Sequence, residues 1–238
     1  MSNEIVKPED AGCLAVTTIQ KGFESPIHPE DLIFPRAKLI QGLSPEMQDV
    51  ESAGKYRVGM IINSLTKEEL PKEFIPIFFW KNWVRFNSRD IKDEENFDPH
   101  FKPGDIIWTS NDEHDPRVVE QACFGSHGEK PKAITFFNFM AHFTDITTPL
   151  VISFSKTSLK AGKQLLSMAK LSGLDMWGCK YNLTSTMESG AGATFAIYAV
   201  SLVGRVTPEE YNLCENLWSN FSPQVKNIKV QDVSDVPF

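Results

Sequence analysis

The chain has 238 residues, of which 41% are hydrophobic and 23% charged, and its net charge is −7. Enough apolar side chains are present for the buried core of one medium-sized domain, which excludes a disordered chain. No signal peptide and no apolar run of membrane length occur, and the four cysteines form no Cys-x-x-Cys pair. We therefore expect a cytoplasmic protein with free thiols and no membrane partner.

The chain divides into an arm, a main domain and a tail. Residues 1–30 are polar and interrupted by prolines, which predicts an N-terminal arm with little regular structure. The main domain is predicted over residues 31–221. It opens extended, because Phe34 precedes Pro35 and the residue before a proline avoids the helical region. Residues 222–238 lack clear periodicity and are predicted to form a flexible tail.

Runs rich in aromatic and β-branched residues predict the strands of the main domain. In chain order they span residues 55–63, 74–86, 132–144, 150–155, 177–184 and 194–206. A helix after the fourth run is capped by Thr157 or Ser158 and ends at Gly173. The last helix begins at a capping box, Thr207 to Glu210, with Pro208 at its first position.

This order predicts a mainly β fold with some α-helix. Strands followed by one helix, two more strands and an appended helix match the order of an OB-fold. We therefore expect an OB-fold-like five-stranded antiparallel barrel, with a helix between its third and fourth strands and a helix at its C-terminal end. Residues 90–130 are acidic, contain several prolines and fit no strong pattern, so they are predicted to be a long inserted loop.

The strand over residues 74–86 is the best candidate surface for binding. Alternate residues of a strand share a face, so one face carries two aromatic rings interleaved with two cations: Phe79, Lys81, Trp83 and Arg85. Single-stranded nucleic acids need such a surface, because rings stack on bases and cations contact phosphates. The opposite face, which includes Trp80, would then be core. Three alternatives stay open: both faces are core, the insertion covers them, or a bulge exchanges them.

Further cations and a metal site are weaker candidates. Arg36 and Lys38 either add to the cations of this surface or are ordinary solvated charges. Three lysines of the first helix region share one side, which favours a solvated helix face; they are Lys156, Lys160 and Lys163. Zinc binding in the inserted loop is an alternative to ordinary packing there, because Cys123 and His127 have the spacing of ligands. The other possible ligands are His114 and His100.

Signatures of catalysis are absent from the sequence. It contains no phosphate-binding glycine loop, no dinucleotide fingerprint, no nucleophile elbow and no His-Glu-x-x-His. The carboxylates between Asp90 and Asp115 are explained by a charged insertion. We therefore expect no enzyme and no cofactor.

The last four residues are Asp235-Val236-Pro237-Phe238, and Asp232 precedes them. They offer a partner an aromatic ring, a carboxylate and flanking acids, on a backbone that proline restricts. This ending resembles the C-terminal tip of bacterial and phage single-stranded DNA-binding proteins, which ends in Asp-x-Pro-Phe or close to it. In that family the tip recruits replication and repair enzymes. The present tail departs from the family in having few acids and two nearby lysines, Lys226 and Lys229.

The strand order, the aromatic strand and this ending together resemble a phage-type single-stranded DNA-binding protein. The resemblance covers most of residues 31–238. It implies a protein of the host cytoplasm that coats single-stranded DNA without sequence preference during phage replication, recombination or repair. The implied DNA contacts are Arg36, Lys38, Phe79, Trp80, Lys81, Trp83 and Arg85, and the implied docking tip is Asp232, Asp235, Pro237 and Phe238. A protein-interaction or assembly factor, a strand-annealing accessory factor and a homo-oligomer remain open.

Overall fold

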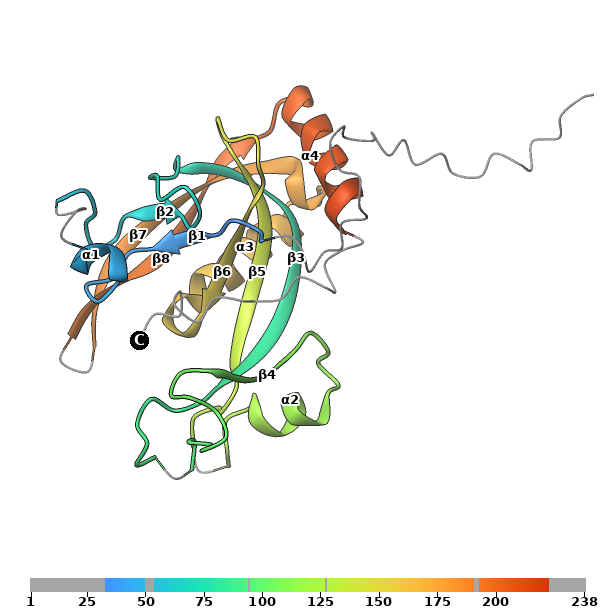
Figure 1. The fold of residues 1–238 in the computed structure, drawn as a ribbon. Helices are drawn as coiled ribbons and strands as arrows, with labels where there is room; N and C mark the ends of the chain where they lie inside the picture. The colour runs from blue at the N-terminus through green and yellow to red at the C-terminus, as the bar shows by residue number, and fades with distance from the viewer. Residues whose placement is uncertain (1–32, 50–53, 94, 127, 191–192, 223–238) are drawn as a thin grey trace, which may run out of the picture.

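The structure is a computed structural model that describes residues 33–49, 54–93, 95–126, 128–190 and 193–222. It is mainly β with some helices (Figure 1). Six strands form an antiparallel sheet that strand pairing does not close, and two short strands form a second sheet. No helix in the described ranges is both long and apolar enough to span a membrane.

The order of the large sheet is β6-β5-β3-β7-β8, and β4 pairs with the end of β3. Its strands are β3 (Glu73–Phe86), β4 (Ile106–Ser110), β5 (Ile134–Phe143), β6 (Leu150–Ser155), β7 (Cys179–Gly190) and β8 (Ala193–Arg205). The small sheet contains β1 (Ala37–Leu39) and β2 (Ile61–Asn63). The helices are α1 (Pro45–Gln48), α2 (Pro116–Gln121), α3 (Leu159–Leu171) and α4 (Pro208–Phe221), with short 3-10 turns at η4 (Lys156–Ser158) and η5 (Met176–Gly178).

Two apolar clusters lie on opposite faces of the sheet. The larger cluster joins β3, β5 and β6 to β7, β8 and α3, and its centre is aromatic: Phe74, Phe139, Phe143, Phe154 and Tyr181 are fully buried. The smaller cluster lies under α4 and η5, where Cys214 and Trp177 pack against Ile77 and Met140 of the sheet. Both faces are covered over much of the sheet, so apolar side chains of β3 can be buried on either face.

The first strand, β1, lies between β6 and β8, the two outer strands of the large sheet. On one side Arg36 and Val151 form a parallel β-bridge, and the Val151 amide donates to the Pro35 carbonyl at 2.9 Å. On the other side the Tyr198 hydroxyl donates to the Ala37 carbonyl at 2.7 Å. The gap between β6 and β8 is therefore bridged by β1.

The contact of β1 with β8 is made by side chains. The side-chain amide of Gln41 donates through Nε2 to the Ala196 carbonyl at 2.8 Å and accepts through Oε1 from the Ala196 backbone amide at 3.0 Å. This side chain therefore takes the place of a neighbouring strand at Ala196. Two residues further, the Tyr198 amide donates to the Ser158 hydroxyl at 3.2 Å. These bonds satisfy backbone groups of β8 that a paired strand would otherwise satisfy.

Gly162 sets how closely α3 approaches β6. A Cβ added at Gly162 would lie 2.8 Å from Cβ of Phe154 on β6, which is closer than two carbon atoms can pack. The glycine lies in the interior of a helix, where it costs about 1 kcal/mol relative to alanine. Close packing against the sheet explains why the position is not alanine.

We therefore expect Gly162→Ala to lower the free energy of unfolding. Overpacking costs about 1–3 kcal/mol, more than the gain in helix propensity of about 1 kcal/mol. Urea denaturation measures the change. Gly204→Ala is the control, because nothing lies within 4 Å of a Cβ added there. An unchanged or raised stability of Gly162→Ala would contradict the close approach of α3.

Two sequence predictions of the fold need correction. The segment predicted as an inserted loop contains a strand and a helix: β4 pairs with β3, and α2 begins at Pro116 with the Asp115 side chain accepting from the Arg117 amide. We call residues 87–133 the inserted lobe; it lies at one end of the sheet (Figure 1). The strand predicted over residues 55–63 is reduced to β2, because turns occupy the residues before it.

Candidate nucleic-acid interface

The aromatic and cationic residues of β3 share one face, but that face is packed and not open. Phe79 pairs with Phe139 of β5. Its ring centroid lies 5.0 Å from that of Phe139 and 5.1 Å from that of Phe137. Trp83 is only 8% exposed. Phe79 and Trp83 therefore contribute to packing first, and only their remaining exposed edges are available to a ligand.

The two cations of this face also have contacts within the protein. Lys81 Nζ lies 5.6 Å from the centre of the Phe137 ring, within the range of a cation–π interaction. Arg85 Nη1 donates to Gln121 Oε1 of α2 at 3.0 Å. Both side chains are half-buried. Arg85 thus ties the inserted lobe to the sheet.

Trp80 belongs to the opposite face. It is 8% exposed and packs in the smaller apolar cluster, with its ring centroid 5.5 Å from that of Phe78. Its indole Nε1 is buried and has no hydrogen-bond partner within the described residues. A buried donor without a partner costs about 1–3 kcal/mol, so packing has outweighed hydrogen bonding at this residue.

A pocket of about 370 Å³ lies where the free edge of β3 meets the inserted lobe. Its lining residues are Phe79, Trp80, Lys81, Trp83, Asn111, Asp112, Glu113 and His114. Three aromatic side chains and one ammonium come from the strand, and two carboxylates come from the lobe. The volume lies in the range of small-molecule sites. The aromatic wall suits a flat ring, whereas the two carboxylates repel phosphate.

Lys38 lies away from this pocket in an internal ion pair. Its side chain is 6% exposed, and its Nζ lies 3.2 Å from Glu46 Oε1. Lys67 Nζ lies 3.0 Å from the same oxygen. Burial alone would raise the pKa of Glu46, but hydrogen bonds from its own backbone, Lys67 and Lys38 lower it overall. This geometry gives Lys38 a role in holding α1 against the small sheet.

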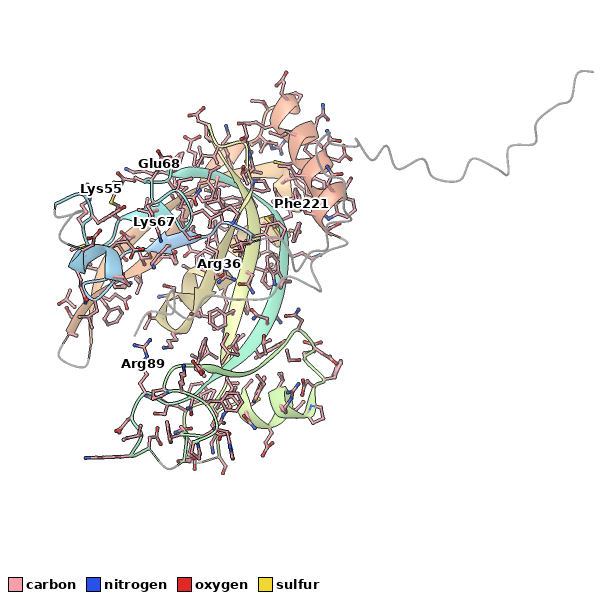
Figure 2. The ribbon with its side chains drawn as sticks, in the orientation of Figure 1. Arg36, Lys55, Lys67, Glu68, Arg89 and Phe221 are labelled. Carbon is pink, nitrogen blue, oxygen red and sulfur yellow. The ribbon has the colours of Figure 1, made fainter. Side chains whose placement is uncertain are left out.

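Arg36 lies at the junction of the two sheets. Its amide donates to the Ser64 hydroxyl at 2.9 Å, and the residue is half-buried. Figure 2 shows Arg36 in the body of the domain, separated from Lys67, which follows β2, and from Arg89 of the inserted lobe. The predicted DNA contacts are therefore not one continuous surface: the β3 residues lie together, and Arg36 and Lys38 lie elsewhere.

The structure brings no metal ligands together within the described ranges. No group of three or more His, Cys, Asp or Glu side chains there could hold a metal ion. His114 is 87% exposed and its Nε2 lies 3.9 Å from Glu113 Oε1. Cys123 is also exposed. His127 lies outside the described residues, as does the predicted docking tip, Asp232 to Phe238.

Sequence reasoning missed a polar contact that crosses three strands. Asn138 Nδ2 donates to Asn82 Oδ1 at 2.6 Å, and Ser153 Oγ donates to Asn138 Oδ1 at 2.7 Å. Both asparagines are almost completely buried. The signal in the sequence was an Asn in the middle of each aromatic strand, since Asn is depleted in strands. These bonds favour one register of β3, β5 and β6 over all others.

The class defined by fold and site is a mainly β protein with a twisted antiparallel sheet, an inserted lobe and an aromatic pocket between them. The family model described as Pam3 phage gp34-like protein matches residues 10–226. The chain therefore belongs to the Pam3 phage gp34-like protein family, whose description points to a bacteriophage protein. No curated protein and no solved structure matches the chain.

Proposed function

We propose that this protein binds single-stranded DNA without sequence preference and coats it during phage DNA replication or recombination. The observation that carries the proposal is the pocket at the edge of β3, where Phe79 and Trp83 stand on either side of Lys81. Stacking of a base on an aromatic side chain is worth about 1–3 kcal/mol and tolerates any base. Phe79 is half-buried and Trp80 and Trp83 are each 8% exposed, so edges of three rings are available in one pocket.

The order of the strands supports the same proposal. We propose that β3, β5, β6, β7 and β8 correspond to the five strands of an OB-type barrel. The helix α3 then falls between the third and fourth of them, and β1 fills the gap between the third and the fifth. In OB-folds the loops between strands 1 and 2 and between strands 4 and 5 contact oligonucleotides. The inserted lobe holds the first of these positions, and it supplies one wall of the pocket.

Recruitment of replication or recombination proteins through Asp235 to Phe238 stays a prediction from the sequence. A protein-interaction role has one observation of its own in its favour. Phe124 and Val119 of the inserted lobe are 71% and 61% exposed. Where such side chains adjoin in one patch, they mark surfaces that bind proteins. Failure to bind either single or double strands would favour this alternative.

Fluorescence anisotropy of a labelled oligo-dT of about 30 nucleotides tests the proposed function, with matched duplex as competitor and at several salt concentrations. We expect binding that duplex does not displace and that weakens along a straight line of log affinity against log salt. The phosphate contacts require this salt dependence. Absence of binding at micromolar protein would contradict single-strand binding.

A further inference from the structure

The segment around α3 carries positive charge and no negative charge. Residues 146–174 contain four lysines and no Asp or Glu. Exposed helices usually carry both signs, because pairs of opposite charge three or four residues apart stabilise them. The whole protein has a net charge of −7. A stretch of 29 residues with lysine as its sole charged residue type is therefore a local exception in an acidic chain.

Three of these lysines lie on the exposed side of α3. Its buried residues are Ala161, Gly162, Leu165 and Ala169, which face the sheet. Lys160, Lys163 and Lys170 are exposed. Steps of three and seven residues keep these side chains within about 80° around the helix axis, since each residue turns about 100°. No salt bridge involves any of the three within the part of the chain that the structure describes.

A fourth lysine extends this side toward the inserted lobe. Lys156 begins the 3-10 turn before α3 and has a positive φ of 48°, a conformation that is uncommon for residues with a side chain. Partial burial, followed by the charge of Arg89, lowers the pKa of the Lys156 ammonium. Arg89 comes from the lobe, where its side chain lies against Gly104, so two distant segments bring cations together here. Figure 2 shows Arg89 pointing away from the lobe.

The lysines are held on a rigid support. Gly162 allows α3 to pack directly on Phe154, whose ring lies 5.4 Å from Tyr198 and 5.7 Å from Phe139. A helix of 13 residues is about 20 Å long. Its position relative to the sheet is fixed by the core, so the charges on it are pre-organised for a long polyanion.

We infer that the exposed side of α3, with Lys156 and Arg89, is the surface that contacts the phosphates of the bound single strand. This inference rests on the proposed function and adds a site to it, because the aromatic pocket has a carboxylate wall that repels phosphates. We call this surface the α3 track; it consists of Arg89, Lys156, Lys160, Lys163 and Lys170. In this proposal the stacking of bases is assigned to the pocket, and the contacts with phosphates are assigned to the α3 track.

The triple variant Lys160→Ala, Lys163→Ala, Lys170→Ala tests the α3 track. For a single strand, each phosphate contact makes the slope of log affinity against log salt steeper by about 0.7. Loss of three contacts should therefore make the slope shallower by about 2. Over a fourfold range of salt, the affinity of the variant should then change about 16-fold less than that of the wild type. Adding Arg89→Ala should lower the slope by about a further 0.7.

The matched control is Lys55→Ala, Lys72→Ala, Lys130→Ala. These lysines are exposed, they are not next to Arg89 in the sequence, and the change in net charge is the same. The control should keep the wild-type slope. Equal slopes for both triples, with a wild type that binds oligo-dT, would overturn the α3 track and leave the proposed function intact. A wild type that fails to bind oligo-dT would overturn the proposed function itself.

Duplex DNA in the same titration identifies the polyanion. We expect the wild type to bind oligo-dT more tightly than duplex, and the α3 track triple to lose mainly oligo-dT affinity. A wild type that binds duplex equally well, with the same loss in the triple, would overturn the assignment of the track to single strands. Circular dichroism and urea denaturation of each variant confirm that the fold is kept.

Discussion

Replacing Trp83 with alanine should lower the free energy of unfolding by about 3–5 kcal/mol, the range for large aromatic residues in a core. The side chain is 8% exposed, and it lies where β3 pairs with both β4 and β5, opposite Ser110 and Thr135. Truncation would leave a cavity between the sheet and the inserted lobe. Urea denaturation at neutral pH measures the change.

Trp218→Ala on α4 is the matched control, because this tryptophan is 42% exposed and should cost clearly less. Equal losses for the two variants would contradict the buried position of Trp83. A variant that unfolds says nothing about stacking, so the affinity test needs Trp83→Phe. That variant keeps a flat ring, and we expect it to bind oligo-dT less than tenfold more weakly than the wild type.

Glu46→Gln should also cost about 3–5 kcal/mol, because it leaves the buried ammonium of Lys38 without its carboxylate. Glu46 Oε1 accepts from Lys67 and lies 3.2 Å from Lys38 Nζ, and the side chains of Glu46 and Lys38 are 10% and 6% exposed. Glu69→Gln is the matched control. Its partner Arg57 is 75% exposed and Glu69 is 50% exposed, so its loss should be about 0–1 kcal/mol.

The same pair makes a prediction for pH. The pKa of Glu46 is lower in the folded protein than in the unfolded chain, so the carboxylate of Glu46 takes up a proton less readily in the folded state. The stabilisation is therefore fully present above the ordinary pKa of glutamate, about 4.3, and is lost as the pH falls through the lower folded pKa. The difference in stability between wild type and Glu46→Gln should shrink below about pH 4. A difference that grows with acid would contradict this ion pair.

Most regular elements could be predicted from the sequence, because their signals are local. The aromatic runs predict β3, β5 and β6, and all three are confirmed. The capping box before α4 is confirmed in full: the Thr207 hydroxyl accepts from the Glu210 amide, and the Glu210 carboxylate accepts from the Thr207 amide. Such signals need only residues a few positions apart, so tertiary contacts do not alter them.

The packing of β3 could not be predicted in the same way. Alternation correctly groups Phe79 with Trp83, but it cannot tell whether anything covers a face. Here α4 and η5 cover one face of the sheet, while the other face packs in the larger cluster with α3, β7 and β8. Only the assembled structure decides how much of each ring stays accessible.

The inserted lobe and the N-terminal end of α3 were missed for a related reason. The run of β4 is short and surrounded by charges, and its partner Trp83 lies far from it in the sequence. Thr157 or Ser158 was predicted to cap α3. Ser158 holds the N-cap position, but its hydroxyl accepts from the Tyr198 amide on β8 and makes no capping bond. In both cases the deciding contact is with a strand that is distant in the sequence: β3 for β4, and β8 for Ser158.

The outer edge of β8 differs from the paired edges of the large sheet, because side chains and not a neighbouring strand bond to its backbone. Gln41 and Ser158 accept from the Ala196 and Tyr198 amides through their side chains, so rotation of these side chains can free the amides while every paired strand stays intact. Each such bond contributes about 0.5–1.5 kcal/mol, well below the free energy of unfolding a whole domain. These amides should therefore exchange with solvent hydrogen through local opening rather than global unfolding. Hydrogen exchange should therefore distinguish the outer edge of β8 from the paired edges of the sheet.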